Sequence, residues 1–315
     1  MKSIAPKTDF QTITKALLDN NKPFLPKFLH VFSDISIEDF KDLETIWGDI
    51  NVERRISLLS DLEQLLEADT LLCFDDVARI GLGDENPVVR SQAIRLLWES
   101  EDPHFIPVLV HLVENDPEND VRSVAAEALG KFLMMGELDE IPRAKLTEIE
   151  VALLKIVQSS TNSALQQRAL ESLGYSSRDE VPALLKKAYQ NNDKGWMITA
   201  LLAMGRSADQ SWESFVIPML DNHDHDIQVE AIHSAGELEL EKARLALINI
   251  IKEPSEDSEI RFAAIWSLSK IGGEGVRETL ENLYENADED EEEILEKALD
   301  NLESSDGTFG INFLG

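Results

Sequence analysis

The clearest indication of the fold is the stretch VRSVAAEALG, residues 121–130. It follows a ten-residue pattern, apolar-x-x-x-Ala-apolar-x-x-apolar-small, whose places we number 1 to 10. Apolar side chains at positions 1, 5, 6 and 9 share one face of an α-helix, and the alanine at position 5 lets a neighbouring helix approach closely. Copies of the pattern begin at Val89, Val121, Leu165, Trp196, Ile227, Ile260 and Ile294. The pattern therefore predicts a series of similar amphipathic helices.

A second apolar-periodic stretch precedes most copies, for example IPVLVHLV from Ile106 and VPALLKKAY from Val181. Pro107 and Pro182 suit the first turn of a helix, where the missing N–H has no partner in any case. Each repeat is therefore predicted to be a pair of helices. One pair cannot bury its own apolar faces, so the copies must stack. We expect an all-α protein, a right-handed α-solenoid of stacked antiparallel helix pairs.

Residues 106–113 and 116–130, IPVLVHLV and DPENDVRSVAAEALG, resemble a HEAT repeat of the short bacterial type that also occurs in phycobilisome lyase-like proteins. The resemblance implies a HEAT-like superhelix over residues 51–303, with about eight helix pairs. The first copy is degenerate, with Ile56 in place of the alanine. Residues 1–50 are expected to form a helical amino-terminal cap, and residues 304–315 a flexible tail with an apolar motif.

The charge of the chain excludes some classes of partner. Asp and Glu number 61 against 29 Lys and Arg, a formal net charge of −32. Such a surface repels phosphate backbones and anionic lipids, so we expect neither nucleic acid nor membrane as a partner. The start of the sequence lacks the apolar segment of a signal peptide, and no window reaches about 20 apolar residues. A cytoplasmic location is predicted.

Motifs for catalysis are missing from the sequence. GxxxxGK[ST], HExxH and GxSxG do not occur. HEAT-like hydroxylases that contain two irons would carry repeated His-Glu dipeptides, and no histidine here precedes a glutamate. His223 and His225, in the turn DNHDHD, are weak candidates for a metal site. We therefore predict no catalytic residue, no cofactor and no metal, and the sequence leans against an enzyme.

Positions 3 and 7 point away from the core of the predicted helix, towards the concave side of a HEAT-like stack. Most copies place polar residues there, but three consecutive copies do not. These copies carry the apolar stripe, which comprises Ile198, Leu202, Val229, His233, Phe262 and Trp266. A contiguous exposed apolar surface normally marks an interaction site, and a tryptophan in a groove is a typical anchor.

The sequence favours a non-catalytic scaffold that binds a peptide or helix of another protein in its concave groove, along the apolar stripe. Glu127 and Glu171 are expected at an acidic rim, which would favour a partner with basic residues flanking an apolar motif. The competing class is a HEAT-repeat enzyme, or a chromophore lyase or chaperone, that uses the same groove.

Overall fold

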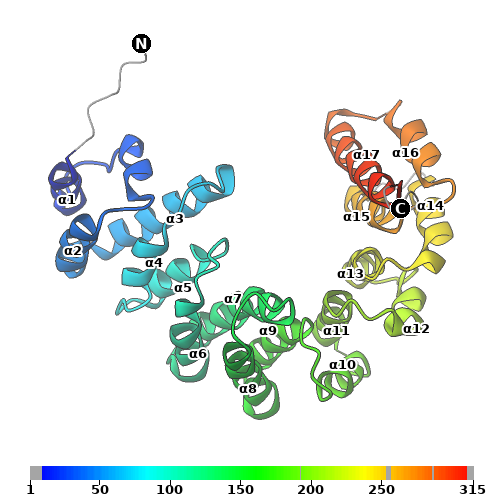
Figure 1. The fold of residues 1–315 in the computed structure, drawn as a ribbon, viewed down its shortest axis with the longest axis horizontal. Coiled ribbons are helices and arrows are strands. Elements are labelled where there is room, and N and C mark those ends of the chain that lie inside the picture. The colour runs from blue at the N-terminus through cyan, green and yellow to red at the C-terminus, as the bar shows by residue number, and fades with distance from the viewer. Residues whose placement is uncertain (1–8, 192, 253–256, 286, 311–315) are drawn as a thin grey trace. The chain divides into compact units, whose positions relative to one another are not determined.

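The computed structural model describes residues 9–191, 193–252, 257–285 and 287–310, with the backbone alone at 289–290 and 305–310 (Figure 1). These residues form α-helices and short 3-10 helices, and none of them lies in a strand. None of the described helices is long and apolar enough to cross a bilayer. The chain divides into two compact units, unit 1 from Met1 to Ala169 and unit 2 from Leu170 to Gly315.

Unit 1 begins with the elements of the predicted cap and continues as helix pairs. In these pairs α5 packs on α4 and α7 on α6, while α3, α5 and α7 stack side by side. The elements are α1 (Phe10–Leu18), η1 (Pro26–Phe32), α2 (Ile37–Ile46), η2 (Trp47–Asp49), α3 (Val52–Ala68), α4 (Asp75–Gly81), α5 (Pro87–Arg95), η3 (Pro103–Phe105), α6 (Ile106–Asn115), α7 (Asn119–Glu137), α8 (Arg143–Ser159) and α9 (Ser163–Leu173), within which the unit boundary falls.

Unit 2 continues the same alternation. The second helices α11, α13, α15 and α17 stack in that order, and each also packs on the first helix of its pair. The elements are α10 (Val181–Tyr189), α11 (Lys194–Arg206), η4 (Gln210–Trp212), α12 (Glu213–Val216), η5 (Ile217–Met219), α13 (His225–Glu237), η6 (Glu241–Ala243), α14 (Arg244–Lys252), α15 (Ser258–Ile271), α16 (Val276–Tyr284) and α17 (Glu289–Gly310). Both units are therefore stacks of helix pairs, which confirms the all-α solenoid.

The ten-residue pattern falls on the second helix of each pair, as predicted. The alanines at position 5 are all between 0% and 4% exposed, and the residues at position 9 are buried as well. Position 5 therefore does sit at a helix–helix contact. The sequence at 131–150 lengthens the helices on either side, since α7 has 19 residues and α8 has 17.

Position 2 supplies a link that the pattern did not show. In five copies an Arg or Gln there donates to a backbone carbonyl at or beyond the end of the preceding helix. These donors are Arg90 to Asp84 and Glu85, Arg122 to Val113, Gln166 to Val157, Gln228 to Leu220 and Arg261 to Ile251, at 2.8–3.0 Å. The last carbonyls of a helix have no partner within it, so these side chains satisfy them and fix the turn of each pair.

Position 10 sets the spacing of the second helices in unit 2. A Cβ on Gly174, Gly205 or Gly236 would lie within 2.6–3.2 Å of the nearest atom in position 8 of the next copy. These facing residues are Ala203, Ser234 and Ser267. The Oγ atoms of Ser234 and Ser267 then donate to the carbonyls of Leu201 and Ile232, at 2.9 and 2.7 Å. We call this series of contacts the glycine ladder.

Two sequence expectations differ from the structure. Ile56, placed at the small position of the degenerate copy, is half-buried, whereas the fully buried face of α3 carries Leu58, Leu59, Leu62 and Leu66. The apolar face of α3 therefore lies in a different register. At the other end α17 continues through Gly310, past Ser304, where the flexible tail was expected to begin. The apolar motif of the expected tail lies mostly outside the described residues.

Candidate functional site

A groove of about 530 Å³ lies in unit 2, along α11, α13 and α15. Each of the three helices contributes its position 7 to the lining, namely Leu202, His233 and Trp266. The groove therefore brings together half of the apolar stripe. Its floor is Gly205 with Ser234, a contact of the glycine ladder.

The rest of the apolar stripe is placed less favourably. Ile198 and Phe262 are half-buried, like Leu202, His233 and Trp266, and do not line the groove. Val229 is buried, with only 9% of its surface exposed, so its predicted place on an open groove floor is wrong. Its helix packs between α11 and α15, which cover it on both sides.

Trp266 is held in the wall of the groove by two neighbours. The His233 ring lies 5.3 Å from the Trp266 ring, and Lys270 Nζ lies 5.4 Å from its centre on α15 itself. Burial lowers the pKa of His233. A second hollow of about 390 Å³, between α15 and α17, is also lined by Trp266. The indole therefore forms a wall between two hollows.

Polar groups at the base of the groove form a small network. Burial raises the pKa of Glu230 to about 7, against the attraction of Arg206. The guanidinium of Arg206 lies 5.2 Å from the Tyr175 ring and donates to the carbonyl of Glu171 at 3.0 Å. The Glu171 carboxylate accepts from the buried Thr199 hydroxyl at 2.9 Å. Apolar walls with a few convergent polar groups are typical of binding sites.

Glu171 does not belong to an acidic rim. Only 8% of it is exposed, because the close packing of α11 covers position 7 of the preceding copy. Glu127, at the same position of its own copy, is exposed as predicted. Both glutamates occupy position 7 of the repeat, but Glu127 is exposed and Glu171 is buried.

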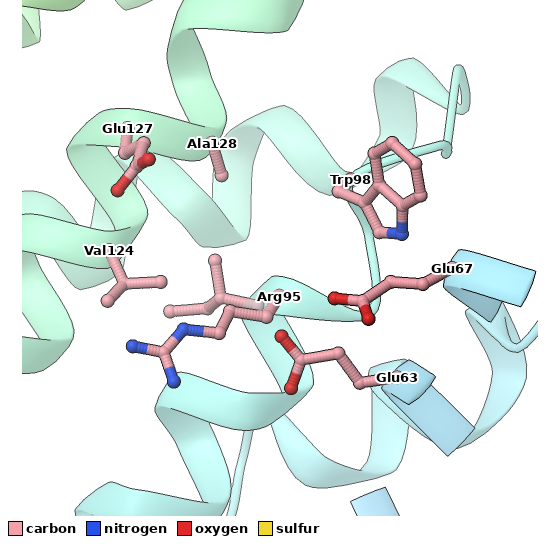
Figure 2. A pocket seen from close by; sticks show the side chains of 8 residues that line it. Glu63, Glu67, Arg95, Trp98, Val124, Glu127 and Ala128 are labelled. Carbon is pink, nitrogen blue, oxygen red and sulfur yellow. The ribbon is translucent and has the colours of Figure 1, made fainter. Parts of the chain in front are cut away.

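The repeat pattern did not predict a pocket that the structure shows in unit 1. It has a volume of about 310 Å³ and lies among α3, the α5 end and α7. Figure 2 shows Glu63 and Glu67 reaching in from α3, Trp98 on one side, and Val124 with Glu127 on the other. Trp98 is 45% exposed.

The origin of this pocket is visible in the repeat. Trp98 occupies position 10, where the copies of the glycine ladder have glycine, and it lines the pocket together with Ala128 at position 8 of the next copy. A tryptophan cannot make the close contact that a glycine makes, so the gap between the second helices stays open. The exception at position 10 was the available signal in the sequence.

The weak metal candidates lie at the start of α13. Both ring nitrogens of His225 face carboxylates, Asp226 at 3.1 Å and Asp257 at 2.7 Å, and these hydrogen bonds raise the pKa of His225. When both ring nitrogens are protonated and donate to carboxylates, no nitrogen lone pair is left for a metal ion. His223 is exposed. In the part of the chain that the structure describes, no three His, Cys, Asp or Glu residues are grouped as a metal site.

The architecture defines the class of protein as an α-solenoid. The HEAT repeats family matches residues 76–146 and 213–303, just over half of the chain, and the chain belongs to this family. A search among curated proteins finds no match to the sequence.

The chain is similar to several solved structures at low sequence identity. The complex of CpcE and CpcF of phycocyanin lyase from Nostoc is 16% identical, with 90% of this chain and 97% of that chain covered and a TM-score of 0.53. The Escherichia coli protein YibA is 15% identical over 88% and 96% of the two chains, with a TM-score of 0.46. Human deoxyhypusine hydroxylase is 16% identical over 94% and 96%, with a TM-score of 0.38.

Proposed function

We propose that this protein is a non-catalytic scaffold that binds a segment of a partner protein in the groove of unit 2. The observation that carries the proposal is the convergence of Leu202, His233 and Trp266 from three successive helices on one groove. In the first three copies and in the last one, position 7 is instead charged, with Arg95, Glu127, Glu171 and Asp300. The groove is thus a local exception in an otherwise regular repeat. In the CpcE–CpcF complex, a related solenoid fold takes part in a protein–protein assembly.

The partner segment would place an apolar or aromatic side chain against Trp266 and Leu202. Glu230 and Glu237 line the same groove, beside Arg206. A basic residue next to the apolar side chain could form ion pairs with these carboxylates. The proposed partner segment therefore combines an apolar side chain with basic residues. A buried aromatic anchor of this kind dominates the affinity of an interface.

The test is a comparison of two tryptophans of unit 2. A partner would be captured from the native source with the parent protein, and its affinity measured by calorimetry for Trp266→Ala and Trp196→Ala. Trp196 is half-buried on α11 but does not line the groove. We expect Trp266→Ala to lose about 2 kcal/mol or more of binding free energy, and Trp196→Ala to bind like the parent. Equal binding by Trp266→Ala, with its thermal unfolding unchanged, would remove the groove as the site.

A further inference from the structure

The pocket at Trp98 in unit 1 combines an open aromatic face with charges that are not engaged elsewhere. No hydrogen bond and no ion pair within the described residues involves the indole of Trp98, the carboxylates of Glu63 and Glu67 or the guanidinium of Arg95, although Arg95 attracts Glu63 electrostatically. These groups surround an unfilled volume of about 310 Å³.

The charges are not spread evenly around the pocket. Figure 2 shows the guanidinium of Arg95 pointing away from Trp98, towards Val124, while the carboxylates of Glu63 and Glu67 reach into the space on the Trp98 side. The nearby cation of Lys131 is already held, since it donates to the Trp98 carbonyl at 3.0 Å and lies 3.8 Å from Glu99. The groups that face the indole are therefore carboxylates, and the pocket's own cation, Arg95, points away from it.

We propose that this pocket binds an arginine side chain of a partner protein. The planar guanidinium would stack on the indole of Trp98 and donate to the carboxylates of Glu63 and Glu67 at the same time. Arginine suits this better than lysine, because its flat cation can stack and donate in several directions at once. A second copy of this chain is a poor occupant, since each copy carries a net charge of −32.

Protonation is consistent with this occupant. Burial and the neighbouring Glu67 raise the pKa of Glu63, whereas Arg95 lowers it. The two carboxylates, one turn apart on α3, thus repel each other in the empty pocket. A guanidinium between them would relieve that repulsion. The site is separate from the groove of unit 2, so either proposal can fail without the other.

The experiment uses the full chain labelled with ¹⁵N and follows the indole N–H signals of its tryptophans. The Trp98 signal is assigned with Trp98→Phe. The probes are the capped peptides Gly-Leu-Arg-Leu-Gly, Gly-Leu-Lys-Leu-Gly and Gly-Leu-Gln-Leu-Gly. We expect the arginine peptide to move the Trp98 signal saturably, with the glutamine peptide at least about tenfold weaker and the lysine peptide in between.

Charge variants then test the contacts. Glu63→Gln/Glu67→Gln should weaken the arginine peptide about tenfold. The control Glu38→Gln/Glu44→Gln makes the same change of net charge on α2, at two exposed residues outside the pocket, and should bind like the parent. Three results would overturn the proposal: a glutamine or lysine peptide that binds as tightly as the arginine peptide, an unchanged affinity of the Glu63/Glu67 variant, or a Trp266 signal that moves as much as Trp98. A Trp98 signal that no peptide moves would overturn it as well.

Discussion

Unit 1 and unit 2 use the same ten-residue pattern but pack their second helices differently. In unit 2 the glycines of the glycine ladder at position 10 meet Ala or Ser at position 8 of the next copy, and Thr199 and Ala263 at position 4 are buried, whereas Glu230 at position 4 lines the groove. In unit 1 Trp98 stands at position 10, and Val124 and Ala128 at positions 4 and 8 line a pocket instead. Glycine at position 10 therefore accompanies close packing of two second helices, and Trp98 at position 10 accompanies a pocket between them.

The two arrangements also place the available surface differently. Where the helices are close, the surface left open is the line of position 7, on which Leu202, His233 and Trp266 form a groove. At Trp98 the open surface is instead the pocket between the second helices, and residues of both charges from α3, the α5 end and α7 line it. The same repeat can thus offer an apolar groove and an acidic aromatic pocket within one chain.

The glycine ladder should be the most sensitive feature. A Cβ on Gly174 would lie 2.6 Å from the carbonyl oxygen and 2.7 Å from the Cα of Ala203, both backbone atoms that cannot move alone. We expect Gly174→Ala to lower the free energy of unfolding by about 3 kcal/mol, measured by urea denaturation. Gly48→Ala is the control, because a Cβ there meets nothing within 4 Å. Equal stability of the two variants would mean that the close contact does not define unit 2.

Glu230 should make the stability of unit 2 depend on pH. Its pKa is raised from 4.5 to about 7, so between these values the folded protein holds a proton that the unfolded chain has lost. The free energy of unfolding therefore falls as the pH rises through this range, and it stays lower above it. Glu230→Gln should match the parent near pH 4.5 and exceed it by about 2 kcal/mol at pH 8.

The control for this experiment is Glu237→Gln, an exposed glutamate that lines the same groove. It should change the free energy of unfolding by less than about 0.5 kcal/mol at either pH. If Glu230→Gln shows the same small difference at pH 8 as at pH 4.5, the carboxyl group is well solvated and the base of the groove is more open than its burial indicates.

Glu171 and Glu127 test the comparison at one position of the repeat. Glu171→Ala leaves the buried Thr199 hydroxyl without its acceptor at 2.9 Å, so it should lower the free energy of unfolding by about 1–2 kcal/mol. Glu127→Ala removes an exposed side chain and should change it by less than about 0.5 kcal/mol. Chemical denaturation of both variants in one buffer decides this, and a larger loss for Glu127→Ala would reverse the assignment of rim and core.

The smallest effect is expected in the pocket of unit 1. Burial and Glu67 raise the pKa of Glu63, so the ionised group is mildly unfavourable in the folded protein at neutral pH. Glu63→Gln should therefore raise the free energy of unfolding by a few tenths of a kcal/mol at pH 7, since the group is only partly buried and the attraction of Arg95 offsets part of the cost of burial. The gain should vanish well below the pKa of an ordinary glutamate, where both carboxyls are protonated. A loss of stability at pH 7 would show that Glu63 has a favourable partner.

The repeat, the pairing of the helices and their buried faces could be predicted from the sequence alone. Position 5 is alanine in all seven copies, and each of these alanines is buried. In a helix with 3.6 residues per turn, apolar residues at the spacing of this pattern fall on one face, and that face is the one that packs. The same regularity located position 7 of three copies on one groove. These are properties of a single helix and its nearest neighbour, which a local pattern can encode.

The distances between neighbouring helices could not be predicted from the repeat pattern. Val229 and Glu171 were predicted to be accessible from their positions on a single helix, yet both are covered by neighbouring copies. Trp98 departs from the repeat pattern at a single position, and the pocket beside it also requires the residues that face it from α3 and α7. Exposure at a helix face is set by the distance to the next helix, and that distance comes from side chains that lie about 30 residues away in the sequence.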